Sequence, residues 1–239
     1  MISNDALKIL VNKYQTTELN VRREYVQHLF LSYFYQQPAS DKIYFKGGTA
    51  LRLLYNSPRF SEDLDFSSAL TGTHEIEGAL LETLEAVERE NIQTHLKESK
   101  KTSGGYLSII SFELGNRGVT LQLDISLRAG RKRGEVVTIV SDYIPAFPVV
   151  ALTREQLVAE KIQALLTREK ARDFYDLYFI LRANLLPAQQ KMVLAQVHQR
   201  LERTAINFEQ ELKQFLPKSH WAVIRGFPDT LEREIERFL

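Results

Sequence analysis

The sequence predicts an α+β protein in which helices flank a mixed sheet and a helical C-terminal part follows. Helical periodicity occupies about the first 37 residues, and from Thr153 onward the pattern is helical almost to the end. Between them lie four strand-like stretches, at about 92–98, 106–114, 119–127 and 135–140. Because the strands are segregated from the helices along the chain, the α+β class is favoured.

The N-terminal part predicts two helices. Leu7, Leu10 and Tyr14 recur at the helical spacing of three to four residues, and a similar pattern continues to a break near residue 38. After the break we expect short strands at 43–45 and 64–66 and helices at 49–55 and 75–91. The elements up to residue 151 form one expected domain, 1–151, and the helical remainder forms a second, 152–239.

The composition limits the class of protein. The 239 residues contain no cysteine, which excludes disulfides and thiolate metal sites. The first residues carry scattered charges without an apolar stretch, and no apolar run reaches the roughly 18 residues that a membrane-spanning helix needs. We therefore expect a cytoplasmic protein with no membrane partner.

Charge alone does not identify a partner, because the net charge is only +1. Basic residues gather at 128–133 and at 97–101. These are either solvated loops or a surface that contacts an RNA backbone or a triphosphate.

The most informative segment places two glycines before two aspartates. A predicted strand ends in Gly47 and Gly48, and a helix follows at Thr49. Glycine lets a ligand approach the backbone, and a helix N-terminus offers unpaired N–H groups and a positive dipole. Thr49 or Gly48 can cap this helix, and Thr49 adds a hydroxyl. The turn therefore suits a phosphate group.

Asp63 and Asp65 follow on a predicted strand. Because side chains alternate along a strand, both carboxylates are expected on one face, with Leu64 and Phe66 directed into the core. Two carboxylates on one face repel each other unless a cation lies between them. Mg²⁺ bound to both carboxylates and to triphosphate oxygens is the expected arrangement. The glycine pair and the two aspartates are each unspecific alone, but in this order, separated by one short helix, they are a strong signal.

Together these motifs resemble the DNA polymerase β-type nucleotidyltransferase superfamily. More narrowly, they resemble the AbiEii/AbiGii toxin family, the nucleotidyltransferase component of type IV toxin–antitoxin systems. The matching segments are Gly47-Gly48-Thr49, Arg59-x-Ser61-Glu62-Asp63-Leu64-Asp65-Phe66, Glu160-Lys161 and Ala171-Arg172-Asp173-Phe174-Tyr175-Asp176-Leu177-Tyr178. The resemblance covers about residues 40 to 182, and residues 183–239 match no motif. It implies a polymerase β-like core within residues 1–151 and a helical subdomain, 152–239, that completes the site.

The resemblance also implies further site residues. The superfamily carries a third carboxylate on a later strand, and Asp124, between Leu123 and Ile125, fits that place. It is a candidate metal ligand, or the base for the attacking hydroxyl, and the alternative is a plain exposed aspartate. For Lys161 the resemblance implies a role on the triphosphate, and the alternative is a lysine whose stem lies along apolar surface.

Four more residues belong to the candidate site. The essential late aspartate of the family maps best onto Asp173 and next onto Asp176. The two lie three apart on a predicted helix, where Arg172 can pair with Asp176, so an internal salt-bridge cluster is the alternative. Arg59 and Ser61 precede the carboxylates, and they either contact phosphates or hold the loop.

The expected function is transfer of a nucleoside monophosphate from an NTP to an acceptor, with Mg²⁺ as cofactor. If the toxin resemblance holds, the acceptor is the tRNA 3′ end or another RNA, growth stops, and a cognate antitoxin exists. One alternative is a transferase that acts on a small molecule such as an aminoglycoside. Another is a degenerate fold that binds a nucleotide or a partner without chemistry. The basic residues at 128–133 favour an RNA acceptor, and the intact Asp63, Asp65 and Lys161 argue against a degenerate fold.

Overall fold

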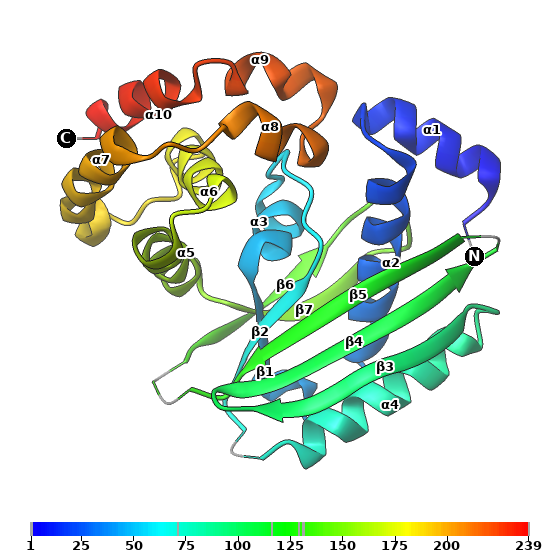
Figure 1. Ribbon diagram of the computed structural model, residues 1–239. Coiled ribbons are helices and arrows are strands. Elements are labelled where there is room, and N and C mark those ends of the chain that lie inside the picture. Colours follow the sequence, from blue (N-terminus) through cyan, green and yellow to red (C-terminus); the bar gives the residue numbers. More distant parts are fainter. Residues whose placement is uncertain (1, 71, 116, 129, 131, 239) are drawn as a thin grey trace. The chain divides into compact units, whose positions relative to one another are not determined.

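The described residues form an α+β protein with a mixed sheet, which confirms the predicted class (Figure 1). This computed structural model describes residues 2–70, 72–115, 117–128, 130 and 132–238. The chain forms two compact units. The first contains Met1–Asn56 and Phe60–Leu152, and the second contains Ser57–Arg59 and Thr153–Leu239.

The strands of the first unit form a single sheet. They are β1 (Ile43–Lys46), β2 (Leu64–Ser68), β3 (Gln93–Thr102), β4 (Gly105–Leu114), β5 (Arg117–Ser126), β6 (Gly134–Ile139) and β7 (Phe147–Leu152). Their order across the sheet is β3-β4-β5-β2-β1-β7-β6. Strands β3, β4 and β5 form an antiparallel meander. The pairs β2–β5 and β1–β7 are parallel, and the pairs β1–β2 and β6–β7 are antiparallel. The parallel pairing of β2 with β5 brings segments that are distant in sequence side by side.

Helices cover one face of this sheet. The helical elements of the first unit are α1 (Asn4–Tyr14), α2 (Glu18–Phe34), the 3-10 turn η1 (Ser40–Lys42), α3 (Gly47–Tyr55) and α4 (His74–Glu88). Helices α2 and α4 contact each other, and they contact β5 and β3 respectively (Figure 1). Phe34 of α2 packs on Phe66 of β2 with ring centroids 5.4 Å apart, and Phe66 packs on Phe45 of β1 at 5.7 Å. All three rings are fully buried, which stabilises the fold by roughly 2–3 kcal/mol per ring.

Burial alternates along the strands as a half-covered sheet requires. In β5, Leu121, Leu123 and Ile125 are buried, whereas Asp124 between them is partly exposed. In β2, Leu64 and Phe66 are buried and Asp65 is partly exposed. The polar residues Asp65 and Asp124 therefore lie on the face opposite α2 and α4.

The second unit is built of helices around an aromatic core. Its α-helices are α5 (Arg154–Arg168), α6 (Ala171–Arg182), α7 (Leu194–Arg203), α8 (Phe208–Leu212), α9 (Trp221–Ile224) and α10 (Phe227–Glu236). Its 3-10 turns are η2 (Ala188–Val193), η3 (Lys213–Phe215) and η4 (Lys218–His220). Phe174 of α6 packs edge-on against Phe208 of α8 at 5.6 Å, and Phe208 lies 4.9 Å from Phe227 of α10. These contacts join residues 183–239, where the sequence offers no motif, to the predicted helix of Asp173.

Some local expectations need correction. Strand β7 was not among the expected strands, and its second residue is Pro148, which cannot donate a ladder hydrogen bond. The structure accommodates Pro148 opposite Thr138 of β6, three residues before Ala151, the residue that pairs with β1. Asp63 directly precedes β2 instead of lying within it, and α3 begins at Gly47 instead of Thr49.

Two expectations concern the surface. Within the described residues, no helix has both the length and the apolar character that crossing a membrane requires. Arg128 and Arg133 are exposed, as are the lysines of β3, while Arg131 of the same basic cluster lies outside the described residues.

Candidate active site

Charged residues from three neighbouring strands form one row across the sheet. Lys46, at the end of β1, lies directly opposite Asp65 of β2, and Asp65 lies directly opposite Asp124 of β5. Adjacent strands are about 4.8 Å apart, and directly opposite residues direct their side chains to the same face. The structure therefore brings the Asp65 and Asp124 carboxylates together, although 59 positions separate them in sequence.

The glycine turn fits closely around Asp65. Gly47 is the first residue of α3 and has a φ of +85°, a conformation that favours glycine. A Cβ atom added at Gly47 would lie 2.1 Å from Oδ2 of Asp65. The Asp65 carboxylate thus lies against the first turn of α3, where the helix dipole favours negative charge. Phosphate oxygens are favoured by the same field.

Asp63 is held through its backbone. The side chain of Thr49 is fully buried in α3, and its Oγ1 donates a hydrogen bond to the backbone oxygen of Asp63 at 2.5 Å. The Thr49 hydroxyl, predicted from the sequence to lie on a phosphate, is thus engaged with the loop that precedes β2. A role for Thr49 or Gly48 on phosphate stays a prediction.

The carboxylates suit a hard cation. Among the residues that the structure describes, no group of three or more His, Cys, Asp or Glu side chains is arranged to hold a metal ion. The predicted ligand set of Asp63, Asp65 and Asp124 is therefore not preassembled, and it stays a prediction. Mg²⁺ commonly uses only one or two carboxylates when substrate phosphates complete its shell. The neighbouring Asp65 and Asp124 meet that requirement with oxygen donors, and Asp124 Oδ2 also accepts a hydrogen bond from Gln122 Nε2 at 2.7 Å.

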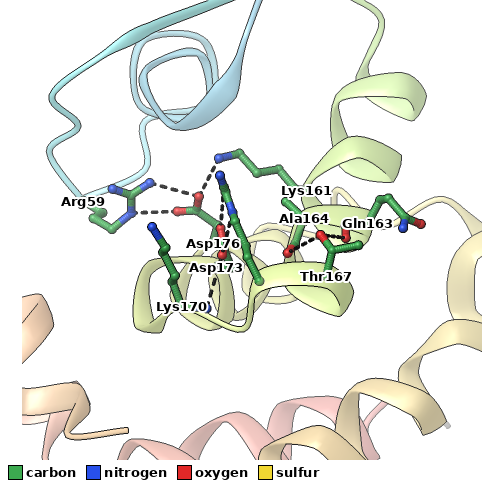
Figure 2. A network of polar contacts seen from close by, with 9 residues as sticks. Arg59, Lys161, Gln163, Ala164, Thr167, Lys170, Asp173 and Asp176 are labelled. Atoms are coloured by element: carbon green, nitrogen blue, oxygen red, sulfur yellow. Dashed lines mark hydrogen bonds and ion pairs between the residues drawn. The ribbon is translucent and has the colours of Figure 1, made fainter. Parts of the chain in front are cut away.

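The second unit contains a buried ion-pair network around Asp176 (Figure 2). Arg59 donates to both carboxylate oxygens of Asp176, at 2.7 and 2.9 Å, and Lys161 Nζ donates to Oδ2 at 2.8 Å. The three side chains are only 4%, 1% and 10% exposed, in the order Arg59, Asp176, Lys161. Burial alone would raise the pKa of Asp176, but the two cations outweigh burial and lower the pKa to about 2. Asp176 is therefore ionised and holds both cations in place.

Asp173 forms a separate pair one turn away. Its carboxylate is almost fully buried and accepts hydrogen bonds from Arg168 Nε at 3.0 Å and from Arg168 Nη2 at 2.8 Å. It also accepts from the backbone N–H of Lys170, the N-cap residue of α6, at 3.4 Å. Asp173 thus contributes to the start of α6. The salt-bridge alternative describes these contacts, with one correction: Arg59, not Arg172, is the arginine that pairs with Asp176.

A protein-family model matches the part of the chain that contains all of these site residues. It is the nucleotidyl transferase AbiEii toxin of type IV toxin–antitoxin systems, and it matches residues 29–238. The chain belongs to the AbiEii toxin family. Family membership identifies a nucleotidyltransferase that uses an NTP, and it implies an antitoxin partner. No curated protein matches the sequence.

Solved structures support the fold of this AbiEii-family protein. JHP933 from Helicobacter pylori is 22% identical with a TM-score of 0.60, and the match covers 93% of this chain and 95% of that chain. MenT4, the nucleotidyltransferase toxin Rv2826c from Mycobacterium tuberculosis H37Rv, is 18% identical with a TM-score of 0.63. That match covers 100% of this chain and 93% of that chain. At these identities the likeness shows a shared fold.

In this AbiEii-family protein, sequence reasoning missed residues that hold the site from behind. Gln27 of α2 is 1% exposed and donates to the backbone of the loop before Asp63. Arg52 of α3 pairs with the buried Glu24 of α2 and lies over the ring of Phe60, 3.5 Å from its centroid. Helix α2 is buried on nearly every side, so its hydrophobic pattern gives no signal that distinguishes these polar residues.

Proposed function

We propose that this protein transfers a nucleoside monophosphate from an NTP to the 3′ end of a tRNA in a Mg²⁺-dependent reaction, and thereby inhibits growth in the cytoplasm. The observation that carries the proposal is the pairing in register of Asp65 with Asp124, beside the glycine turn at the start of α3. Carboxylates next to a helix N-terminus combine a place for a cation with a place for phosphates. The tRNA acceptor follows from the family resemblance, and the exposed Arg128 and Arg133 suit a nucleic-acid backbone.

The proposed reaction is a displacement at the α-phosphorus. The acceptor hydroxyl oxygen forms a bond to the α-phosphorus, the bond from that phosphorus to the oxygen bridging to the β-phosphate breaks, and pyrophosphate leaves with the bonding electrons. Asp63 and Asp65 would hold the metal, which would supply positive charge against the phosphates. The Asp124 carboxylate would either add a ligand to the metal or accept the hydroxyl proton. The backbone around Gly47 and Gly48 binds phosphate oxygens.

For the second unit, the proposed roles rest on the family resemblance. Lys161 neutralises charge that develops on the triphosphate, and Asp173 and Asp176 support that role. Arg59 keeps Asp176 ionised, and the Asp176 carboxylate holds the Lys161 ammonium in place. A kcat loss in Lys161→Met, measured under conditions in which circular dichroism shows the variant to be folded, supports this role, whereas a wild-type kcat in the folded variant would assign Lys161 to structure alone.

The acceptor is tested by labelling. Purified protein is incubated with Mg²⁺, each α-labelled NTP in turn, and total tRNA, and the products are separated on a denaturing gel. Periodate oxidation of the tRNA removes the 3′ hydroxyl and serves as the matched control. Label on intact tRNA, but not on oxidised tRNA, is expected. Label on the protein or on an added aminoglycoside, with none on tRNA, would refute the proposed acceptor.

A further inference from the structure

The loop that leads into Asp63 has no regular secondary structure, so its backbone needs hydrogen-bond partners from elsewhere. Gln27, in the middle of α2, supplies two of these bonds. Its Nε2 donates to the backbone oxygen of Ser61 at 3.0 Å and to the backbone oxygen of Glu62 at 3.2 Å. The same helix also pairs Arg23 with the Glu62 carboxylate at 3.1 Å.

Thr49 supplies the next bond in the series. Its hydroxyl donates to the backbone oxygen of Asp63 at 2.5 Å. Three successive carbonyl groups, those of residues 61, 62 and 63, are therefore held by two side chains. Gln27 and Thr49 are 1% and 0% exposed, so water does not replace these bonds easily.

We propose that Gln27 and Thr49 are positioning residues that fix the backbone of residues 61–63 and thereby set the direction of the Asp63 carboxylate relative to Asp65. Neither residue needs to touch the substrate. Side chains that orient metal ligands from behind commonly change metal affinity or activity by about 10–100-fold when removed. The inference rests on the proposed metal-holding role of Asp63 and Asp65.

Two features separate this role from ordinary core packing. Both donors bind main-chain oxygens of one short loop, so their loss changes the loop without removing apolar surface. Gln27 also lies just before the residues that the family model matches, 29–238, so the match assigns it no role. The structure shows the Thr49 hydroxyl bonded to this loop, while its predicted contact with phosphate stays a prediction.

Substitutions that preserve shape provide the test. Gln27→Met keeps the length of the side chain and removes its N–H donors, and Thr49→Val keeps the branching and removes the hydroxyl. Thr83→Val is the matched control, because Thr83 is also fully buried and its Oγ1 donates to the Ala79 oxygen at 2.6 Å within α4. Gln36→Met is the control for Gln27, because Gln36, an exposed residue two positions after the end of α2, donates through Nε2 to the Ser32 oxygen at 2.7 Å and not to the loop before Asp63.

Three measurements are made on the full chain. Amide hydrogen exchange of residues 61–65 reports the loop without metal or nucleotide. Titration with Mn²⁺ alone, followed by electron paramagnetic resonance, reports metal binding without catalysis. Transfer from the α-labelled NTP reports kcat and KM. Thr49→Ser, which restores a hydroxyl, is included as a rescue variant.

We expect both site variants to exchange residues 61–65 faster, to bind Mn²⁺ more weakly, and to lose about 10–100-fold in kcat/KM, mainly through kcat. Thr49→Ser should recover most of the loss, and both controls should behave as wild type. Site variants that match their controls in exchange and in Mn²⁺ binding would overturn the positioning role. If wild type transfers no nucleotide, the proposed function fails, and the exchange and Mn²⁺ measurements still decide the positioning role.

Discussion

Replacement of Asp176 by asparagine removes the carboxylate that pairs with two buried cations. Arg59 and Lys161 both donate to this carboxylate, and none of the three side chains is more than 10% exposed. Lowering of the Asp176 pKa from 3.8 to about 2 corresponds to roughly 2 kcal/mol in favour of the charged form. Removal of one partner from a buried ion pair costs about 3–5 kcal/mol. We therefore expect Asp176→Asn to lower the free energy of unfolding of the second unit by about 3 kcal/mol.

Trp221 gives a local assay for this change. It is the single tryptophan of the chain and lies in the second unit, where its Nε1 donates to the Leu216 oxygen at 3.3 Å. Urea unfolding followed by Trp221 fluorescence therefore reports that unit. Glu169→Gln is the matched control, because it removes the carboxylate of a pair with Arg200 in which both side chains are about 40% exposed, worth at most about 1 kcal/mol. A loss for Asp176→Asn no larger than for Glu169→Gln would refute the buried-network argument.

Three other predictions concern the first unit. Burial lowers the pKa of His28 from 6.5 to about 3, so the unfolded state binds a proton at this residue more readily than the folded state does. The free energy of unfolding should therefore fall by roughly 1 kcal/mol per pH unit as the pH drops below 6.5. In thermal melts followed by circular dichroism, His28→Leu should lose less stability over the same pH range. Gly47→Ala should abolish transfer and lower the free energy of unfolding by about 1–3 kcal/mol, because the added Cβ collides with Asp65. Gly78→Ala is the control: a Cβ there meets no atom within 4 Å, so neither activity nor stability should fall. Asp124→Asn should lower kcat by about 10²–10⁴-fold with an unchanged urea midpoint, and a variant with wild-type kcat would exclude Asp124 as the base.

Local elements were predictable because their signals are local. Alternation along β5 and helical spacing in α1 appear directly in the order of apolar residues. Strand β7 was missed: it contains Pro148, a residue that is unfavourable within a strand, and its pairing with β1 and β6 is visible only in the fold.

The long-range part of the site was not predictable in the same way. The motif order indicated the chemistry of Asp63 and Asp65, and alternation suggested the face of Asp124. The register that places Asp124 directly opposite Asp65 depends on a parallel pairing between distant strands. For Asp176 the sequence offered only the nearby Arg172 as a possible partner, because Arg59 is 117 positions away and only the fold brings it close.

The buried polar residues that support the site are even harder to recognise from the sequence. Gln27 lies in a helix that is buried on nearly all sides, so no polar face marks it. Its role appears only when the carbonyl groups of the loop before Asp63 are assigned their donors.

The most direct test of the nucleotidyl-transfer site compares two positions of the label. Wild type and Asp65→Asn are incubated with Mg²⁺, total tRNA and the accepted NTP, labelled at either the α- or the γ-phosphate. Wild type should transfer the α-label to the acceptor and release the γ-label as pyrophosphate, while Asp65→Asn, still folded by circular dichroism, should do neither. Transfer of the γ-label to the acceptor, or equal α-label transfer by both proteins, would contradict the site built on Asp65.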